Sequence, residues 1–177
     1  MACRSDGHNL RYEYIYDENR KILNETSCVW ENEWINSWRH TFNYDENANM
    51  LSDLFEKWEY GQWQNDWRYI NLYDSKGNRI TNIRQEWEND NWIFEYRFLY
   101  NYDENGNNDT ITFENWEKDT WVNDWKNVYT YNTKNDLICN LRLEWENGLW
   151  VKYQRTTYEY DANGNRKTFF HEKWYNK

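Results

Sequence analysis

A tyrosine-led motif recurs along the chain at an almost constant interval, and no other feature restricts the fold as strongly. The motif begins at Tyr16, Tyr44, Tyr73, Tyr102, Tyr131 and Tyr160, with spacings of 28, 29, 29, 29 and 29 residues. Fourteen residues after each tyrosine stands a tryptophan, at Trp30, Trp58, Trp87, Trp116, Trp145 and Trp174. Units this short bury a face only by stacking on their neighbours. The sequence therefore predicts a single repeat domain over residues 1–177, built from six units of about 29 residues.

Side chains alternate in character within each unit. In the stretch WIFEYRFLYNY (92–102), every second residue is aromatic. A period of two is typical of a β-strand and does not fit a helix. The stretch RITNIRQEW (79–87) is similar in length and rich in β-forming residues. With two strands in each unit, we predict an all-β fold of twelve antiparallel strands, joined in sequence order as a meander.

Two kinds of turn connect these strands. Asn147-Gly148 suits a type I′ hairpin, which needs positive φ at both central residues. The sequence DENG (103–106) suits a type I turn closed by a left-handed glycine, with its Asp side chain accepting hydrogen bonds from backbone N–H groups. Arg20, Ala48 and Asn135 replace that glycine in three copies. Asparagine tolerates the left-handed conformation, so we expect only the turns at Arg20 and Ala48 to differ.

The tight turns have a tryptophan on each side, as in WENGLW (145–150). A four-residue turn places its flanking residues opposite each other, so Trp145 and Trp150 form a cross-strand pair. Such pairs contribute roughly 0.2–1 kcal/mol each and fix the register. The arrangement resembles the designed tryptophan-zipper hairpins.

The tyrosine-led turns YDSKGN (73–78), YDENGN (102–107) and YDANGN (160–165) resemble the YD repeats of Rhs-type proteins. Long arrays of this family form curved antiparallel sheets that wrap into hollow shells, often around a toxin. The resemblance covers nearly the whole chain and implies a curved hairpin sheet, although six repeats are too few to enclose a domain. The Trp-rich turns are similar to short versions on bacterial surface proteins, which implies an extracellular or cell-surface location.

The two ends of the chain favour closure of the sheet. The chain begins on the strand type that follows a Trp turn and ends on the type that precedes one. Pairing of these ends would remove both exposed edges. We therefore expect a closed or flattened barrel, with an open curved single sheet that stacks on another copy as the alternative.

Pairing the strands outward from the Trp turns places polar and aromatic residues on one face. Glu56 then lies opposite Asn65 and Glu114 opposite Asn123, while Leu54, Ile83 and Thr112 lie opposite Trp67, Tyr96 and Trp125. One interpretation makes this face the packed interior of the barrel. The other makes it a groove that binds sugar rings through stacking and hydrogen bonds. The candidate ligand-binding residues are Trp38, Glu56, Asn65, Trp67, Tyr96, Glu114, Asn123 and Trp125.

A column of basic residues repeats at one position of the unit, at Arg11, Arg39, Arg68, Arg97, Lys126 and Arg155. We place this column on the opposite face. It is interpreted as a solvated ladder paired with acids on neighbouring strands, where each pair contributes little. An anion-binding stripe is the alternative.

Composition excludes several classes of partner. The net charge of −10 would repel a phosphate backbone, so nucleic acid is excluded, and no apolar run is long enough for a transmembrane helix.

The three cysteines are not a disulfide framework. The start MACRSDG would also arise from a lipoprotein precursor cut near a lipidated cysteine, so a lipid anchor at Cys3 is an alternative to an ordinary tail.

No chemical motif stands out. DENGNND (103–109) is loosely like a calcium loop but lacks its glycine and glutamate positions, so a plain turn is the better interpretation. The three histidines are scattered without metal-ligand spacing. We expect no enzyme, no cofactor and no metal. The predicted function is a non-catalytic binding module, with glycan as the candidate ligand; a structural or self-assembling protein, docking a partner protein or another copy, is the alternative.

Overall fold

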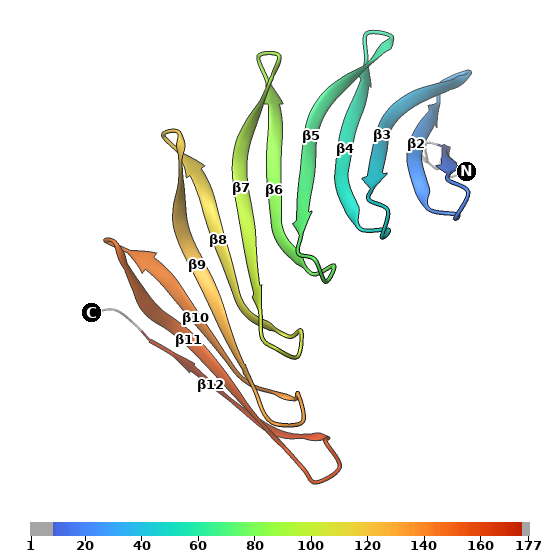
Figure 1. Ribbon diagram of the computed structural model, residues 1–177. Coiled ribbons are helices and arrows are strands. Elements are labelled where there is room, and N and C mark those ends of the chain that lie inside the picture. The colour runs from blue at the N-terminus through green and yellow to red at the C-terminus, as the bar shows by residue number, and fades with distance from the viewer. Residues whose placement is uncertain (1–8, 175–177) are drawn as a thin grey trace, which may run out of the picture. The chain divides into compact units, whose positions relative to one another are not determined.

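The computed structural model describes residues 9–174, and this part of the chain contains strands and turns but no helix (Figure 1). The strands are β1 (Leu10–Tyr16), β2 (Ile22–Trp30), β3 (Trp34–Tyr44), β4 (Met50–Glu59), β5 (Gln62–Tyr73), β6 (Arg79–Glu88), β7 (Asn91–Tyr102), β8 (Asn108–Glu117), β9 (Thr120–Tyr131), β10 (Leu137–Glu146), β11 (Leu149–Tyr160) and β12 (Arg166–Lys173). They confirm the prediction of twelve strands. Since residues 9–174 hold no helix, no membrane-crossing helix is found there.

The sheet is open. Its strand order is the sequence order from β1 to β12. In the described residues β1 pairs with β2, and β12 pairs with β11. Closing a barrel requires hydrogen bonds between the first and last strands. The prediction of a closed barrel is therefore wrong, and the open single sheet is the observed arrangement.

Contacts between Cα atoms group the chain into two compact units. Within the described residues, the first comprises residues 9–71 and 84–94, and the second comprises residues 72–83 and 95–174. Each unit is described by itself below. The predicted lipid-anchor residue, Cys3, lies outside the described residues.

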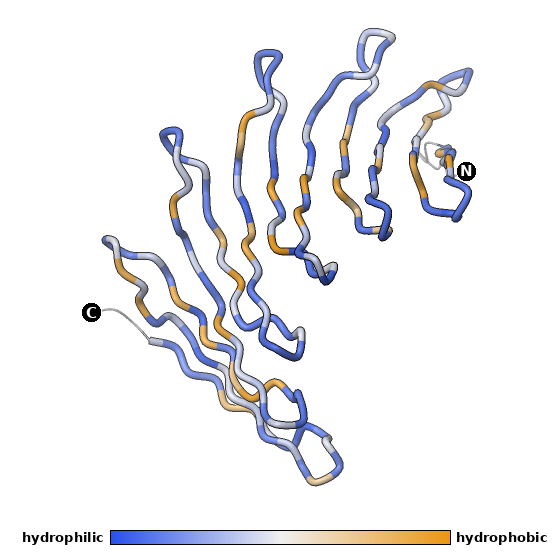
Figure 2. Tube along the Cα trace, in the orientation of Figure 1, coloured by the Kyte–Doolittle hydropathy of each residue, from blue (hydrophilic) through white to orange (hydrophobic). Residues whose placement is uncertain are grey.

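Neither unit contains a conventional apolar core. Cys28 is the single buried hydrophobic residue among residues 9–174. The other buried side chains are polar, namely Ser27, Glu56, Asn71, Gln85 and Glu114. Figure 2 shows apolar residues scattered along the strands and hydrophilic turns. The interpretation of a packed barrel interior is therefore wrong, and stability has to come from columns of side chains along each face.

The Trp turns have the predicted geometry. Trp145 lies opposite Trp150, with ring centroids 4.9 Å apart and planes inclined at 64°. Asn147 and Gly148 have φ values of 51° and 82°, as a type I′ turn requires. The same edge-to-face pairing recurs at the other Trp turns, at distances of 5.4 Å (Trp30–Trp34), 5.0 Å (Trp58–Trp63), 4.9 Å (Trp87–Trp92) and 4.9 Å (Trp116–Trp121).

The tyrosine-led turns are built around an aspartate. Asp103 Oδ1 accepts hydrogen bonds from the backbone N–H groups of Asn105 and Asn107, at 2.9 and 2.8 Å. The side-chain amide of Asn107 donates to Asp103 Oδ2 at 3.0 Å. These bonds favour the ionised form, and the amide of Asn107 contributes most to lowering the pKa of Asp103.

The turns at Arg20 and Ala48 adopt the same closure as the glycine turns, so the expectation that they differ is wrong. Arg20 has φ 65° and donates its N–H to Asp17 O at 3.1 Å, and Ala48 has φ 75° and donates to Asp45 O at 3.0 Å. A left-handed non-glycine residue costs roughly 1–2 kcal/mol. Hydrogen bonds to the aspartate carboxylate offset this cost. In the Ala48 turn, Asp45 Oδ1 accepts hydrogen bonds from the backbone N–H groups of Asn47 and Asn49.

The motif tyrosines tie each repeat to the previous one. The Tyr44 hydroxyl donates to Ile22 O at 3.0 Å, and the Tyr131 hydroxyl donates to Asn108 O at 3.0 Å. Burial raises the pKa of Tyr44 and Tyr131. The hydroxyls of Tyr102 and Tyr160 make the same bond, so four of the motif tyrosines donate to a backbone carbonyl of the preceding hairpin.

Candidate functional site

A β-bulge follows the Trp turns of β2–β3, β4–β5, β8–β9 and β10–β11 and reverses which side chains share a face of the sheet. In β4 and β5, Glu56 lies opposite Asn65, as predicted, but the next pair is Phe55 and Trp67. Asp66 is the extra residue. An extra residue in one strand shifts every later side chain relative to its partner. Leu54 therefore lies opposite Arg68, and the predicted pairing of Leu54 with Trp67 is wrong.

The second unit has the same bulge. Glu114 lies opposite Asn123 as predicted, and Phe113 lies opposite Trp125, with Asp124 as the extra residue. Thr112 therefore lies opposite Lys126 rather than Trp125. The predicted pairing of Ile83 with Tyr96 stays a prediction.

The bulges divide the eight predicted residues between two faces. The charge face carries the paired turn tryptophans and Glu56, Asn65, Glu114 and Asn123. The ring face carries Trp38, Trp67, Tyr96 and Trp125. The expectation of a single face that interleaves these rings with these carboxylates and amides is wrong. Whether any of the eight binds a ligand stays a prediction.

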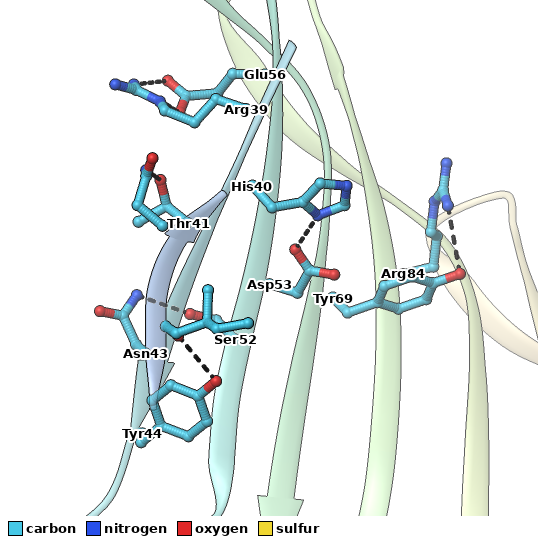
Figure 3. Close-up of polar contacts among 12 residues, drawn as sticks. Arg39, His40, Thr41, Asn43, Tyr44, Ser52, Asp53, Glu56, Tyr69 and Arg84 are labelled. Carbon is cyan, nitrogen blue, oxygen red and sulfur yellow. Dashed lines mark hydrogen bonds and ion pairs between the residues drawn. The ribbon is translucent and has the colours of Figure 1, made fainter. Parts of the chain in front are cut away.

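The basic column lies on the charge face, together with the turn tryptophans, so its placement on a separate face is wrong. Arg39 lies opposite Glu56, and its guanidinium donates to both carboxylate oxygens, with Nε–Oε2 at 2.6 Å and Nη2–Oε1 at 2.7 Å. Figure 3 shows this pair extending to one side of β3 and β4, with His40 and Asp53 on the other. In the second unit Arg97 lies opposite Glu114, and its Nε donates to Glu114 Oε2.

Each basic side chain also covers a tryptophan of the next hairpin. The guanidinium of Arg39 lies 4.6 Å from the centre of the Trp63 ring, and Lys126 Nζ lies 4.4 Å from that of Trp150. Cation–π contacts of this kind contribute about 0.5–1 kcal/mol at exposed sites. Arg39 thus contacts a buried carboxylate and an aromatic ring at once. Whether the column also binds anions stays a prediction.

The ring face of the first unit carries a stack of three aromatic rings and a guanidinium. The rings of Trp38 and Phe55 are 6.1 Å apart, and those of Phe55 and Trp67 are stacked at 5.0 Å with planes inclined at 14°. The guanidinium of Arg84 lies 4.5 Å from the Trp67 ring. All four side chains are partly exposed, so the stack is accessible to solvent within its unit.

Polar groups flank this stack. His40 Nδ1 lies 2.7 Å from Asp53 Oδ1 (Figure 3). The centroid of the His40 ring is 5.4 Å from that of the Trp67 ring. Arg84 donates to Glu86 and to the Tyr69 hydroxyl. Burial opposes the charge of Arg84, but the hydrogen bonds to Glu86 and Tyr69 outweigh it and raise the pKa of Arg84 above its usual value.

The second unit repeats the stack 58 residues later. Its four members are Tyr96, Phe113, Trp125 and Arg142. The rings of Phe113 and Trp125 are stacked at 5.4 Å with the same inclination of 14°, and the Arg142 guanidinium lies 4.5 Å from the Trp125 ring. Sequence reasoning missed the phenylalanines and arginines of both stacks. Their signal was a regular exchange of Phe and Arg at one repeat position, at Phe55, Arg84, Phe113 and Arg142.

A shallow groove of about 500 Å³ opens on the charge face of the first unit. Asn65, Arg68 and Trp92 line it together with Leu54 and other residues. One predicted residue, Asn65, and one aromatic residue, Trp92, are among those that line the groove. No group of side chains in residues 9–174 has the composition of a metal site.

Comparisons with known proteins relate the fold to bacterial structures. No protein-family model matches the chain, and no curated protein matches it. A DUF3836 family protein from Bacteroides vulgatus is 24% identical and covers 49% of this chain and 90% of its own, with a TM-score of 0.42. A protein of unknown function from Bacteroides fragilis is 9% identical over 85% of this chain and 92% of its own, with a TM-score of 0.37.

A structure of the Tc holotoxin pore from Photorhabdus luminescens has a higher TM-score. It reaches 0.51 at 16% identity and covers 89% of this chain. The chain spans about a tenth of that protein's length, since 10% of it is covered. The shared feature is the antiparallel hairpin meander.

Proposed function

We propose that the protein is a non-catalytic binding module that takes its ligand on the ring face. The observation that carries this proposal is the stack of rings and guanidinium in each unit, Trp38–Phe55–Trp67–Arg84 and Tyr96–Phe113–Trp125–Arg142. Rings in a core would be covered by a second layer, but each unit is a single layer of strands, and these residues keep solvent access. Exposed apolar surface of this kind often marks a binding site.

We propose glycans as the ligand class. Flat rings stack on the apolar faces of sugars, and hydrogen-bonding groups beside them bind hydroxyls. The His40–Asp53 pair lies beside the first stack, and Glu86 and Tyr69 lie at its end. A few polar groups beside an aromatic surface are the usual composition of a small-ligand site.

A structural role is the second candidate. The antiparallel meander, shared with the Photorhabdus structure, and the tyrosine-led turns support a short YD-repeat sheet that serves as a scaffold or docks a partner protein. In this case the ring stacks would brace the sheet, as the arginine–tryptophan contacts do on the charge face. We extend the proposal to an extracellular or cell-surface location, in line with the resemblance of the Trp-rich turns.

A glycan-array screen followed by titration of a binding glycan separates these candidates. Trp67→Ala and Trp125→Ala should each weaken binding by roughly fivefold or more, which corresponds to about 1 kcal/mol of stacking. Trp121→Ala, which removes a tryptophan from the charge face, is the matched control and should leave the affinity unchanged while the protein stays folded. Failure of every glycan to bind, or an equal loss in the control, would reject the glycan proposal.

A further inference from the structure

The two terminal strands of the sheet, β1 and β12, carry exposed apolar side chains. Residues at the same repeat positions of the internal strands are half-buried. Every residue of β1 is exposed, and Tyr12 is 47% exposed, whereas Tyr69, which holds the same repeat position in β5, is half-buried. In β12, Phe169 and Phe170 are 66% and 62% exposed. Neither strand contains the proline that often protects a sheet edge.

The repeat makes these two edges complementary. β12 belongs to the strand type of β4 and β10, which precede a Trp turn, and β1 belongs to the type of β5 and β11, which follow one. Internal pairs of these types share one register. Phe55, Leu54 and Asp53 lie opposite Trp67, Arg68 and Tyr69, and Arg142, Leu141 and Asn140 lie opposite Gln154, Arg155 and Thr156. Transferred to the terminal strands, this register pairs His171 with Leu10, Phe170 with Arg11 and Phe169 with Tyr12.

We propose that β12 of one copy pairs antiparallel with β1 of a second copy in this register, which extends the sheet from chain to chain. The pairing places the Phe169 ring of one copy against the Tyr12 ring of the other, on the ring face. Within its own copy, the centroid of the Tyr12 ring lies 6.0 Å from that of the Trp38 ring. On the charge face, Phe170 lies beside the Arg11 guanidinium, as Leu54 lies beside Arg68. The backbone N–H and C=O groups of both edges gain partners.

A second copy fits this edge because the contact continues a register that the chain already uses. The interface is head-to-tail, since different strands of the two copies meet, and such interfaces produce open-ended assemblies when they do not close into rings. The inference rests on the edge strands alone and is independent of the ligand of the ring face. Pairing of β1 with β12 inside one chain is an alternative outcome that the experiment separates.

Mixing two variants that each carry one new exposed cysteine tests the register. Tyr12→Cys and Phe169→Cys proteins are prepared separately with Cys3 and Cys139 replaced by serine; Cys28 is 1% exposed and stays. Mild oxidation of the mixture should give a disulfide-linked dimer that needs both variants. The matched control mixes Phe169→Cys with Glu13→Cys, one position out of register and on the opposite face, and should give little dimer. Absence of dimer in both mixtures, equal dimer in both, or dimer from either variant alone would overturn the proposal.

Light scattering gives a second readout that needs no cysteine. The mean mass of the unmodified chain should rise above its monomer value of 22.4 kDa as the concentration increases. Tyr12→Lys, which places a charge on the exposed edge, should hold the mass near the monomer value while the circular dichroism of the sheet is retained. A mass that stays at the monomer value at every concentration, or a disulfide formed within one chain by the Tyr12→Cys/Phe169→Cys double variant, would overturn head-to-tail pairing.

Discussion

The two units carry the same stack on the ring face, but its surroundings are polar in the first unit and apolar in the second. His40 and Asp53 form a hydrogen-bonded pair beside the first stack. The residues 58 positions later are Phe98 and Ile111, and the Phe98 ring packs 5.0 Å from Phe113. The contact between tryptophan, phenylalanine and arginine is therefore the constant part of the architecture, and the flanking pair is free to vary.

The turns differ between the units in a parallel way. In the first unit Arg20 and Ala48 occupy the left-handed position of the tyrosine-led turns. In the second unit this position is held by Gly77, Gly106 and Gly164 and by Asn135, a residue that tolerates this conformation. The backbone closure is the same in both. The first unit thus departs twice from the locally favoured residue, which predicts that it is the less stable of the two.

The largest effect should follow removal of the central ring of each stack. Trp67→Ala and Trp125→Ala should each lower the free energy of unfolding by about 2–3 kcal/mol, below the cost for a fully buried tryptophan because both rings are partly exposed. Urea unfolding of the two variants measures this. Equal losses of unfolding free energy would support the view that the two stacks are structurally equivalent. A loss in only one of the two variants would contradict this view.

The polar pair of the first unit offers a sharper comparison. His40→Phe alone should cost about 1–2 kcal/mol because it leaves the largely buried Asp53 carboxylate without its partner. Adding Asp53→Ile reproduces the Phe98 and Ile111 pair of the second unit and should recover most of that loss. A double-mutant cycle measured by thermal unfolding gives the coupling between the two positions. Simple additivity of the two single effects would show that the pair is not coupled.

Exchanging the turn residues tests the backbone difference. Ala48→Gly should stabilise the protein by about 1 kcal/mol, because glycine adopts positive φ without the steric cost of a Cβ atom. Gly106→Ala should destabilise it by a similar amount, since an added Cβ would meet nothing within 4 Å and only the backbone strain remains. Changes of the same sign in both variants, measured by thermal unfolding, would contradict this explanation.

The smallest effect concerns acid stability. The side-chain amides of Asn49 and Asn107 are the main cause of the lowered pKa of Asp45 and Asp103, so these aspartates contribute stability that is present above their unfolded pKa of about 3.8. That contribution is lost as the pH falls through the lower folded pKa. Melting temperatures at pH 6 and in increasingly acidic buffer should show a smaller loss for Asp103→Asn than for the parent protein. Asn132 holds the same backbone bonds in the fifth turn and shows that the substitution preserves the geometry.

Sequence periodicity was sufficient for the strand number, the strand order and the pairing next to each Trp turn. It failed beyond the bulge because the extra residues do not all have one residue type that could mark the position. They are Ser37, Asp66, Asp124 and Tyr153. Pairing that is correct at Glu56 and Asn65 is therefore wrong one step later, at Leu54 and Trp67. The one extra residue in each hairpin is the reason why the predicted site residues are divided between two faces.

Closure of the sheet could not be predicted from the strand types at its ends. Complementary ends are equally compatible with pairing within one chain and with pairing between copies. Strand tilt and stagger decide between these outcomes, and they depend on the backbone geometry of all strands together. The exposed Tyr12 and Phe169 became informative only once the described residues showed β1 paired with β2 alone and β12 with β11 alone.

The division of side chains between the two faces is tested most directly by nuclear Overhauser effects from the Trp67 indole. The structure predicts strong cross-peaks to the Phe55 ring, whose centroid lies 5.0 Å away, and the same pattern between Trp125 and Phe113. Cross-peaks from Trp67 to the methyl groups of Leu54, with none to Phe55, would show that the strands pair without the bulge and would contradict the assignment of both faces.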